Sequence, residues 1–355
     1  MNIIKLSIFN LTVLSIVACS RSGVIDQASI TLCNPDSKGI TLVAEDVSLQ
    51  QPNVSNPLYL QLYKDTVLVV QKKINDDNQF HFEAYSTMSS AFLGRFVSNG
   101  RGPGEMLSPH IEPSPSNIGN LRLIENVTGY LYLVDVEKSI SSNKTVFEDV
   151  ISLPDGTLES VDLGGSMSFI AQVEEKELLY RVVTRDSKII RTFHPFRRLD
   201  SWDSVTQLSS ILLANERKGV VAEVMLFLPQ VNFYDTSTGA IHSIAVDRNY
   251  RDWSSIIKEI PGPETTQYYQ CATSSADYIF AIYDNVTLGH MINGDYHSSI
   301  HIFDWGGNFI CQIDVEERLS DISYDSRLHC LFAIKKPSGK IVRYNVSHLI
   351  NALNN

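Results

Sequence analysis

The sequence lacks the short motifs by which several enzyme classes are recognised. It contains no GxSxG, no HExxH and no EF-hand loop. The glycine-rich run at 100–104 is not a phosphate loop, because it lacks the GxxxxGK[ST] frame and a following helix. No motif in the chain implies a cofactor, and we expect none.

Cysteine is scarce as well, and its spacing carries no metal or redox signal. The chain has five cysteines and no CxxC pair, the spacing typical of zinc and dithiol sites. Cys271, Cys311 and Cys330 fall in predicted strands, where we expect them to act as small buried apolar side chains. A disulfide remains an open alternative in an oxidising compartment.

Basic charge and long apolar runs are also missing. Acidic residues outnumber basic ones and give a net charge of −11, whereas binding to nucleic-acid phosphates requires a basic stripe. We therefore expect no nucleic-acid partner. The apolar run at 6–17 holds about 12 residues, and a transmembrane helix needs about 20.

The N-terminus has the three parts of a bacterial lipoprotein signal. Residues 1–5 are a short basic segment, residues 6–17 are apolar, and residues 16–19, Ile-Val-Ala-Cys, resemble a lipobox. The expected processing removes residues 1–18 and leaves Cys19 as the acylated first residue, which anchors the chain to a membrane. A transmembrane anchor and ordinary secretory cleavage are the alternatives.

The residues after Cys19 indicate a location. Ser20 favours the outer membrane, because an Asp at that position would favour retention in the inner membrane. The absence of an acidic run at 20–23 favours the periplasmic face over the cell surface. Scattered Ser, Gly, Asp and Pro predict a tether over 19–39, and residues 40–355 are expected to form one domain.

Residues 299–346 contain a repeating unit of short strands and tight turns. Ile300 to Asp304 alternates apolar and polar side chains, residues 305–308 (Trp-Gly-Gly-Asn) supply a tight turn, and a strand returns from Phe309. Three more strands follow without a helix between them. Four-stranded units that repeat every ~40–50 residues are the signature of a β-propeller. We therefore predict an all-β chain that forms a six-bladed propeller of four-stranded antiparallel blades.

The last predicted blade lacks a strand of its own. Only three strands follow Leu319, so a strand predicted at 41–49 is expected to complete that blade and close the ring. A short helix is predicted at 253–260, where apolar residues recur at helical spacing. The other predicted blades cover 58–97, 121–153, 166–193, 209–246 and 268–314.

Two stretches carry a resemblance to a known family. The glycine-rich run 94–105 is similar to the turn of NHL-like propeller repeats, and it resembles still more the TolB-like six-bladed propeller lipoproteins of the Bacteroidetes. The strand 278–283, the long loop after it, and the Phe-Asp-Trp-x-Gly-Asn turn at 303–308 resemble the same family. The resemblance covers most of 40–350. Its motifs are structural turns, so it implies no catalytic residues.

The loop 284–299 is the most promising place for chemistry. It brings His290, Asp295 and His297 close together in the sequence, and an imidazole beside a carboxylate can bind a ligand or a metal, or exchange protons. We take these three residues as a candidate binding loop and leave metal binding open. The alternative is a solvated polar loop without a function.

Two functions from different classes fit the sequence. The favoured one is an outer-membrane-anchored lipoprotein whose propeller is a binding or scaffolding module for a peptide, glycan or protein partner. The alternative is a propeller lyase or hydrolase that acts on peptides or glycans. Binding is favoured because the histidine-rich loop lies on one blade, whereas propeller catalysis generally needs groups from several. Aromatic residues such as Trp202, Trp253 and Tyr296 are candidate anchors for a partner, and convergence of Tyr63, Arg122 and His290 would favour an enzyme.

Overall fold

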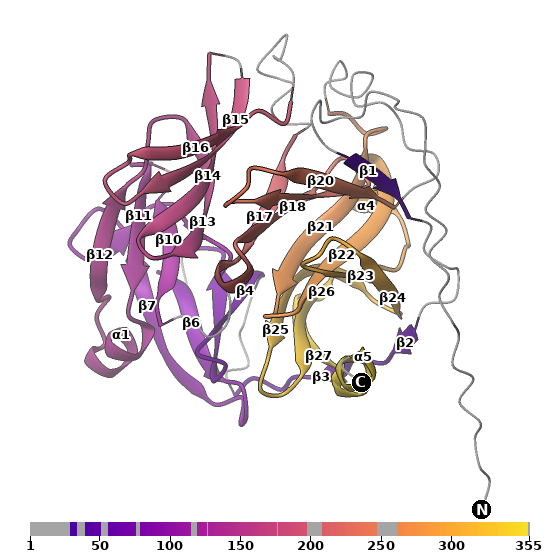
Figure 1. The fold of residues 1–355 in the computed structure, drawn as a ribbon. Helices are drawn as coiled ribbons and strands as arrows, with labels where there is room; N and C mark the ends of the chain where they lie inside the picture. Colours follow the sequence, from indigo (N-terminus) through magenta and orange to yellow (C-terminus); the bar gives the residue numbers. More distant parts are fainter. Residues whose placement is uncertain are drawn as a thin grey trace, which may run out of the picture.

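The computed structural model describes residues 29–33, 40–50, 56–75, 79–114, 119–125, 127–175, 177–196, 208–246 and 261–353. Over these ranges the chain forms six sheets of four or five strands, arranged in a ring as a six-bladed propeller (Figure 1). The predicted fold class is therefore confirmed. The segment 1–18, Cys19, Trp202 and the helix predicted at 253–260, with its Trp253, lie outside the described residues.

Each blade begins at its innermost strand, and the following strands pair antiparallel toward the outside. Innermost strands of neighbouring blades contact one another, as β21 does with β25 and β25 with β4. In chain order, the strands of blades one to six are β4 to β7 (Pro57–Tyr63, Val67–Lys72, Phe80–Ser86, Phe92–Asn99), β9 to β12 (Pro109–Ile111, Leu121–Glu125, Tyr130–Val134, Phe147–Ser152), β13 to β16 (Thr157–Gly164, Met167–Glu174, Glu177–Thr184, Ile189–Phe193), β17 to β20 (Ser210–Asn215, Val220–Met225, Gln230–Asp235, Ile241–Ala245), β21 to β24 (Thr266–Ser274, Tyr278–Thr287, Ser299–Asp304, Phe309–Val315) and β25 to β27 (Arg318–Asp325, Cys330–Lys336, Lys340–Asn345).

The N-terminal segment supplies an edge strand to each of three neighbouring blades. β3 (Glu45–Asp46) pairs antiparallel with β27 and completes blade six, so the predicted closure of the ring is confirmed. β2 (Ile40–Leu42) runs parallel to β24 of blade five, and β1 (Ser29–Leu32) runs parallel to β20 of blade four. Residues 29–32 therefore belong to the propeller and not to a tether, because their backbone groups extend the ladder of blade four. A further two-residue strand, β8 (Glu105–Met106), adds to blade one.

Blades two and three begin earlier in the chain than predicted. Blade two starts at Pro109, and blade three starts at Thr157, since residues 157–164 pair with β14. The stretch 177–185, which the sequence left as one strand or two, contains the single strand β15. Short helices complete the described residues: α1 (Val136–Ser142), η1 (Glu216–Lys218), α4 (Leu288–Asn293) and α5 (Ser347–Leu353). None of the described helices is long and apolar enough to cross a bilayer.

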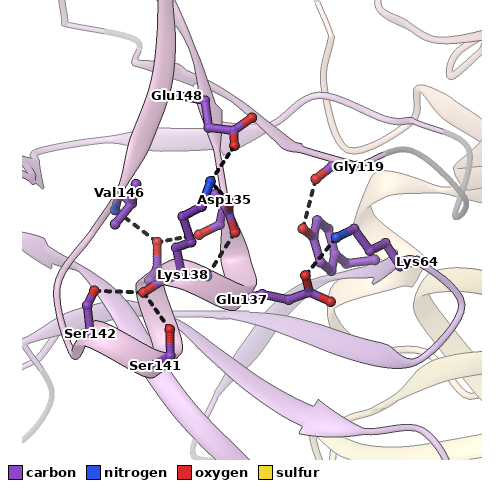
Figure 2. Close-up of polar contacts among 11 residues, drawn as sticks. Lys64, Gly119, Asp135, Glu137, Lys138, Ser141, Ser142, Val146 and Glu148 are labelled. Carbon is purple, nitrogen blue, oxygen red and sulfur yellow. Dashed lines mark hydrogen bonds and ion pairs between the residues drawn. The ribbon is translucent and has the colours of Figure 1, made fainter.

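Helix α1 was not predicted, and it joins blade two to blade one. Asp135 follows β11 and caps the helix, with its Oδ1 accepting a hydrogen bond from the backbone nitrogen of Lys138 at 2.8 Å (Figure 2). Glu137 in the first helical turn pairs with Lys64 of blade one at 2.7 Å. The sequence at 130–135 predicted a strand that ends at Asp135. It did not reveal that Asp135 also begins a helix.

Apolar side chains pack at the boundaries between blades, and the boundary between blades two and three also contains a buried ion network. Clusters of buried apolar residues join blades one and two, three and four, four and five, five and six, and six and one. Between blades two and three, within the described residues, the buried Arg122 pairs with Glu112 at 2.7 Å and contacts Asp162 at 3.4 Å. Ser160 donates to Glu112 at 2.6 Å. A buried ion network therefore adds to the apolar residues of this boundary, such as Leu131 and Ile170.

Candidate functional site

A cavity of about 230 Å³ lies within the ring of innermost strands, and every blade contributes to its lining. A cavity of this kind, with polar groups converging on it, is the place where a ligand site is expected. Each innermost strand contributes at least one polar or titratable residue to the lining, among them Tyr59 of β4, His110 of β9, Glu159 of β13, Ser210 of β17, Cys271 of β21 and Asp321 of β25.

The cavity lies along the middle of the ring of innermost strands, since Asp321 is near the middle of β25 and Cys271 near the middle of β21. Tyr59, His110 and Ser210 each lie near the first residue of their strand. The connection between β22 and β23 lies near the first residue of β21, because Thr287 at the end of β22 pairs with Thr266 at the start of β21. The predicted binding loop is therefore at the end of the ring where the innermost strands begin, and none of its residues lines the cavity.

Asp321 is a deeply buried carboxyl group of the lining. It is 2% exposed, its Oδ2 accepts a hydrogen bond from the backbone nitrogen of Leu60 at 2.5 Å, and its Oδ1 accepts one from the thiol of Cys271 at 2.6 Å. Burial raises the pKa of Asp321 to about 7, against the lowering effect of these hydrogen bonds. Burial also raises the pKa of Cys271 well above its usual range, so the thiol is a hydrogen-bond donor and not a ready nucleophile.

Glu159 is the second unpaired acid of the cavity. Its side chain is partly exposed and makes no ion pair or hydrogen bond within the described part of the chain. Burial, followed by the negative charge of nearby Glu223, raises the pKa of Glu159 to about 8.

Glu223 belongs to a buried polar network behind the cavity wall. It is fully buried and accepts hydrogen bonds from Tyr234 at 2.6 Å, from Asn232 at 2.8 Å, and from the hydroxyl of Tyr180. A second cavity of about 250 Å³ is lined by Glu159, Tyr180 and Ser210 and adjoins the first through their shared residues. Because its oxygens are satisfied by neighbouring side chains, Glu223 is a structural acid that shapes the electrostatics of Glu159.

The described lining contains no lysine or arginine. Glu112 also lines the cavity, but Arg122 neutralises it. Burial lowers the pKa of His110, so its imidazole is neutral, and its ring meets the ring of Tyr59 edge-on at 5.5 Å between centroids. The remaining wall is largely apolar and includes Leu158, Ile211 and Ile322. The cavity thus combines apolar walls with acids that lack a counter-ion.

The residues of the predicted binding loop lie at the surface, at the end of the ring where the innermost strands begin. His290 is exposed on α4, Asp295 is exposed after it, and Nδ1 of the exposed His297 lies 2.5 Å from the carbonyl oxygen of Glu316. Across the described residues, no three His, Cys, Asp or Glu side chains are arranged to hold a metal ion. A binding role for this loop stays a prediction.

The three residues whose convergence would have favoured an enzyme do not meet. Tyr63 packs between blades one and two and donates from its hydroxyl to the carbonyl oxygen of Gly119 at 2.8 Å. Arg122 lies in the ion network between blades two and three, and His290 lies on α4. Tyr296 is partly covered, because the guanidinium of Arg318 lies 4.7 Å from its ring centroid.

Sequence reasoning missed the titratable groups that do converge. Glu159 lies in a strand that was not predicted, and Cys271 was expected only to fill the core. A sequence signal exists, because each of these residues lies in the strand that opens its blade. That signal identifies a site only when the blade boundaries are known.

Comparisons with known proteins identify the fold but no family. Neither a family model nor a curated protein matches the chain. A candidate exported protein of Bacteroides fragilis is 12% identical with a TM-score of 0.57, over 89% of this chain and 99% of that one. A member of the DUF4221 family from Bacteroides vulgatus is 11% identical with a TM-score of 0.58, over 87% of this chain and 96% of that one. At such identity the likeness shows the propeller fold alone, and the TolB-like and NHL-like resemblance stays a prediction at the level of family.

Proposed function

We propose that this chain is an exported lipoprotein, anchored through Cys19, whose propeller binds a peptide, glycan or protein partner at the axial cavity. The observation that carries the proposal is the convergence of six blades on one cavity with apolar walls and unpaired polar groups. The loop with His290, Asp295 and His297 would form part of the rim at the end of the ring where the innermost strands begin. Leu158, 50% exposed, and Tyr59, 41% exposed, offer apolar contact area to an entering group.

The proposed location is the periplasmic face of the outer membrane. The basic, apolar and cysteine-ended N-terminus supports export and lipidation. The Bacteroides fragilis structure of the same fold is itself a candidate exported protein. Ser20 supports the outer membrane over the inner one.

The test separates binding in the cavity from binding elsewhere. Leu158→Trp places a bulky ring at the cavity wall, and Val150→Trp is a matched control, since Val150 is 48% exposed on the outer strand β12. The protein and both variants are used to capture partners from membrane extracts and to screen peptides and glycans. We expect Leu158→Trp to weaken binding at least tenfold and Val150→Trp to preserve it. Equal binding by both variants would refute a site in the cavity.

A lyase or hydrolase acting on peptides or glycans is the second candidate function. One observation favours it: Asp321 and Glu159 have pKa values of about 7 and 8, and a general acid or base works best when its pKa lies near the working pH. Incubation with the same peptides and glycans, followed by mass spectrometry of the products, tests this function. Turnover that disappears in both Asp321→Asn and Glu159→Gln would establish the enzyme, and unchanged substrates would leave binding as the function.

A further inference from the structure

We propose that the axial cavity takes up the ammonium group of a lysine side chain carried by a peptide or protein partner. This inference rests on the proposed function, because it assigns the chemistry of the group that enters the cavity. It is carried by the set of acceptors in the lining, by the absence of a competing cation there, and by the shape of the wall.

The lining offers hydrogen-bond acceptors that the described residues leave without a partner. Gln61 is 8% exposed, and its amide nitrogen donates to the carbonyl oxygens of Ser114 at 2.8 Å and Leu62 at 3.0 Å. This arrangement orients the amide and leaves its carbonyl oxygen as an acceptor in the lining. Glu159 adds a carboxyl group without a hydrogen bond or ion pair among the described residues. An ammonium group has three donors and no acceptor, which complements such a lining.

The electrostatics of the cavity favour a positive group. Asp321 and Glu159 come from blades six and three, which face each other across the ring. Arg122 is committed to Glu112 and does not line the cavity. Charges act more strongly between apolar walls than in water, so a ligand cation would favour the ionised forms of Asp321 and Glu159 and lower their pKa values. A ligand carboxylate would instead be repelled by them. The net charge of −11 on the whole chain acts in the same direction.

The wall favours a lysine stem over a sugar ring. A volume of about 230 Å³ suits one side chain. Leu158 and Tyr59 can cover the four-carbon stem of a lysine while its ammonium group reaches the acceptors. A sugar is usually held against a flat aromatic face, and the described lining contains no tryptophan or phenylalanine and only one tyrosine, Tyr59. An amino sugar has the same charged group, so the experiment below includes one.

The experiment compares ligands that differ only in the charge of one amine. Calorimetry measures binding of the capped tripeptide acetyl-Gly-Lys-Gly-amide and of its Nζ-acetylated form to the full-length protein. The amino-sugar arm compares glucosamine with N-acetylglucosamine. Acetylation of the lysine should weaken binding at least tenfold. Glu159→Gln should reduce this preference to less than threefold, whereas Asp155→Asn, which removes an exposed carboxylate outside the cavity on the same blade, should retain it.

Several results would overturn the inference. The first is equal affinity for the two peptides, and the second is no measurable affinity for the lysine peptide. The third is a Glu159→Gln variant that melts like the wild type and still prefers the unacetylated peptide as strongly. Binding of glucosamine alone would replace the lysine with an amino sugar. If Leu158→Trp abolishes binding of a partner that shows no preference for a free amine, the inference is refuted and the proposed function stands. A partner that Leu158→Trp does not affect would instead refute the proposed function.

Discussion

Two carboxyl groups determine the chemistry of the cavity at the scale of single residues. Burial raises the pKa of Asp321 to about 7 and that of Glu159 to about 8. An acid whose pKa is higher in the folded than in the unfolded state binds more protons when folded, so the free energy of unfolding falls as the pH rises. The loss of stability is absent below the unfolded pKa of about 4 and is complete above the folded pKa.

Glu159→Gln should therefore flatten the pH dependence of stability. Between about pH 5 and pH 9, urea denaturation should show that the variant loses roughly 1–2 kcal/mol less than the wild type, because part of the cost is relieved by water in the cavity. Asp295→Asn changes an exposed carboxylate and should keep the wild-type slope. A slope in Glu159→Gln equal to that of the wild type would show that Glu159 titrates normally.

Gly307→Ala should destabilise the turn between β23 and β24. Gly307 has a φ of +80°, and a Cβ at this position would lie 1.7 Å from Nε2 of His242 in blade four. The loss should exceed ~1 kcal/mol, since both the backbone and the neighbouring ring must shift. In Gly306→Ala the nearest atom to the new Cβ is Oδ1 of Asp304 at 3.2 Å, and no positive φ is needed. Thermal melts should give Gly307→Ala a lower melting temperature than Gly306→Ala. The reverse ranking would contradict this interpretation of the turn.

At the scale of elements, the N-terminal edge strands close the ring. β3 pairs with β27, and the backbone nitrogen of Val47 donates to the carbonyl oxygen of Ile341 at 3.0 Å. Val47 and Leu49 also pack against the apolar cluster between blades six and one. Removal of this segment would therefore expose both a sheet edge and apolar surface.

A chain that begins at residue 51 should be much less stable than one that begins at residue 29. The shorter chain lacks β1, β2 and β3. We expect it to lose more free energy of unfolding than the ~1 kcal/mol of a typical substitution, and therefore to melt at a lower temperature and less cooperatively. The longer chain keeps all three strands and is the matched control. Identical melting temperatures for the two chains would mean that the edge strands do not hold the ring closed.

The ion network between blades two and three gives a second prediction at this scale. Arg122→Met leaves Glu112 buried without a counter-ion, and we expect a loss of about 3–5 kcal/mol in the free energy of unfolding. The double variant Arg122→Met with Glu112→Gln removes the orphaned charge and should recover part of that loss. Urea denaturation measures both. A double variant no more stable than Arg122→Met would indicate that packing, and not charge, dominates this boundary.

The attachment of β1 to blade four would orient the whole molecule on a membrane. If Cys19 carries the lipid, the ten residue-to-residue steps from Cys19 to Ser29 can span at most ~36 Å. The outer edge of blade four would then stay close to the bilayer, whereas blade one lies across the ring from it.

Energy transfer to a membrane dye tests this orientation. A fluorophore is introduced by an unnatural amino acid at Ala240, exposed beside β20 of blade four, or at Met88, 66% exposed on blade one. On liposomes, the lipidated protein should transfer more energy from position 240 than from position 88. Cys19→Ala should abolish both signals and release the protein from the membrane fraction of cells. Membrane binding that survives this substitution would refute lipidation at Cys19.

The sequence by itself determined the architecture. Period-2 alternation, the turn at 305–308 and the missing strand after Leu319 are local signals, and they were sufficient for six blades closed by an N-terminal strand. They failed where local signals were weak: the first strand of blade three at Thr157 was not found, and the capping role of Asp135 was hidden by a strand pattern. The edge pairing of residues 29–32 was also missed, because it depends on a partner strand far along the chain.

Only the tertiary structure decided the site. Tyr59, His110, Glu159, Cys271 and Asp321 are spread over most of the chain, and none belongs to a motif. They converge because each lies in the strand that opens its blade, and the closed ring brings the innermost strands together. The raised pKa values of Glu159 and Asp321 have the same origin, since a carboxyl group is desolvated only when other blades surround it.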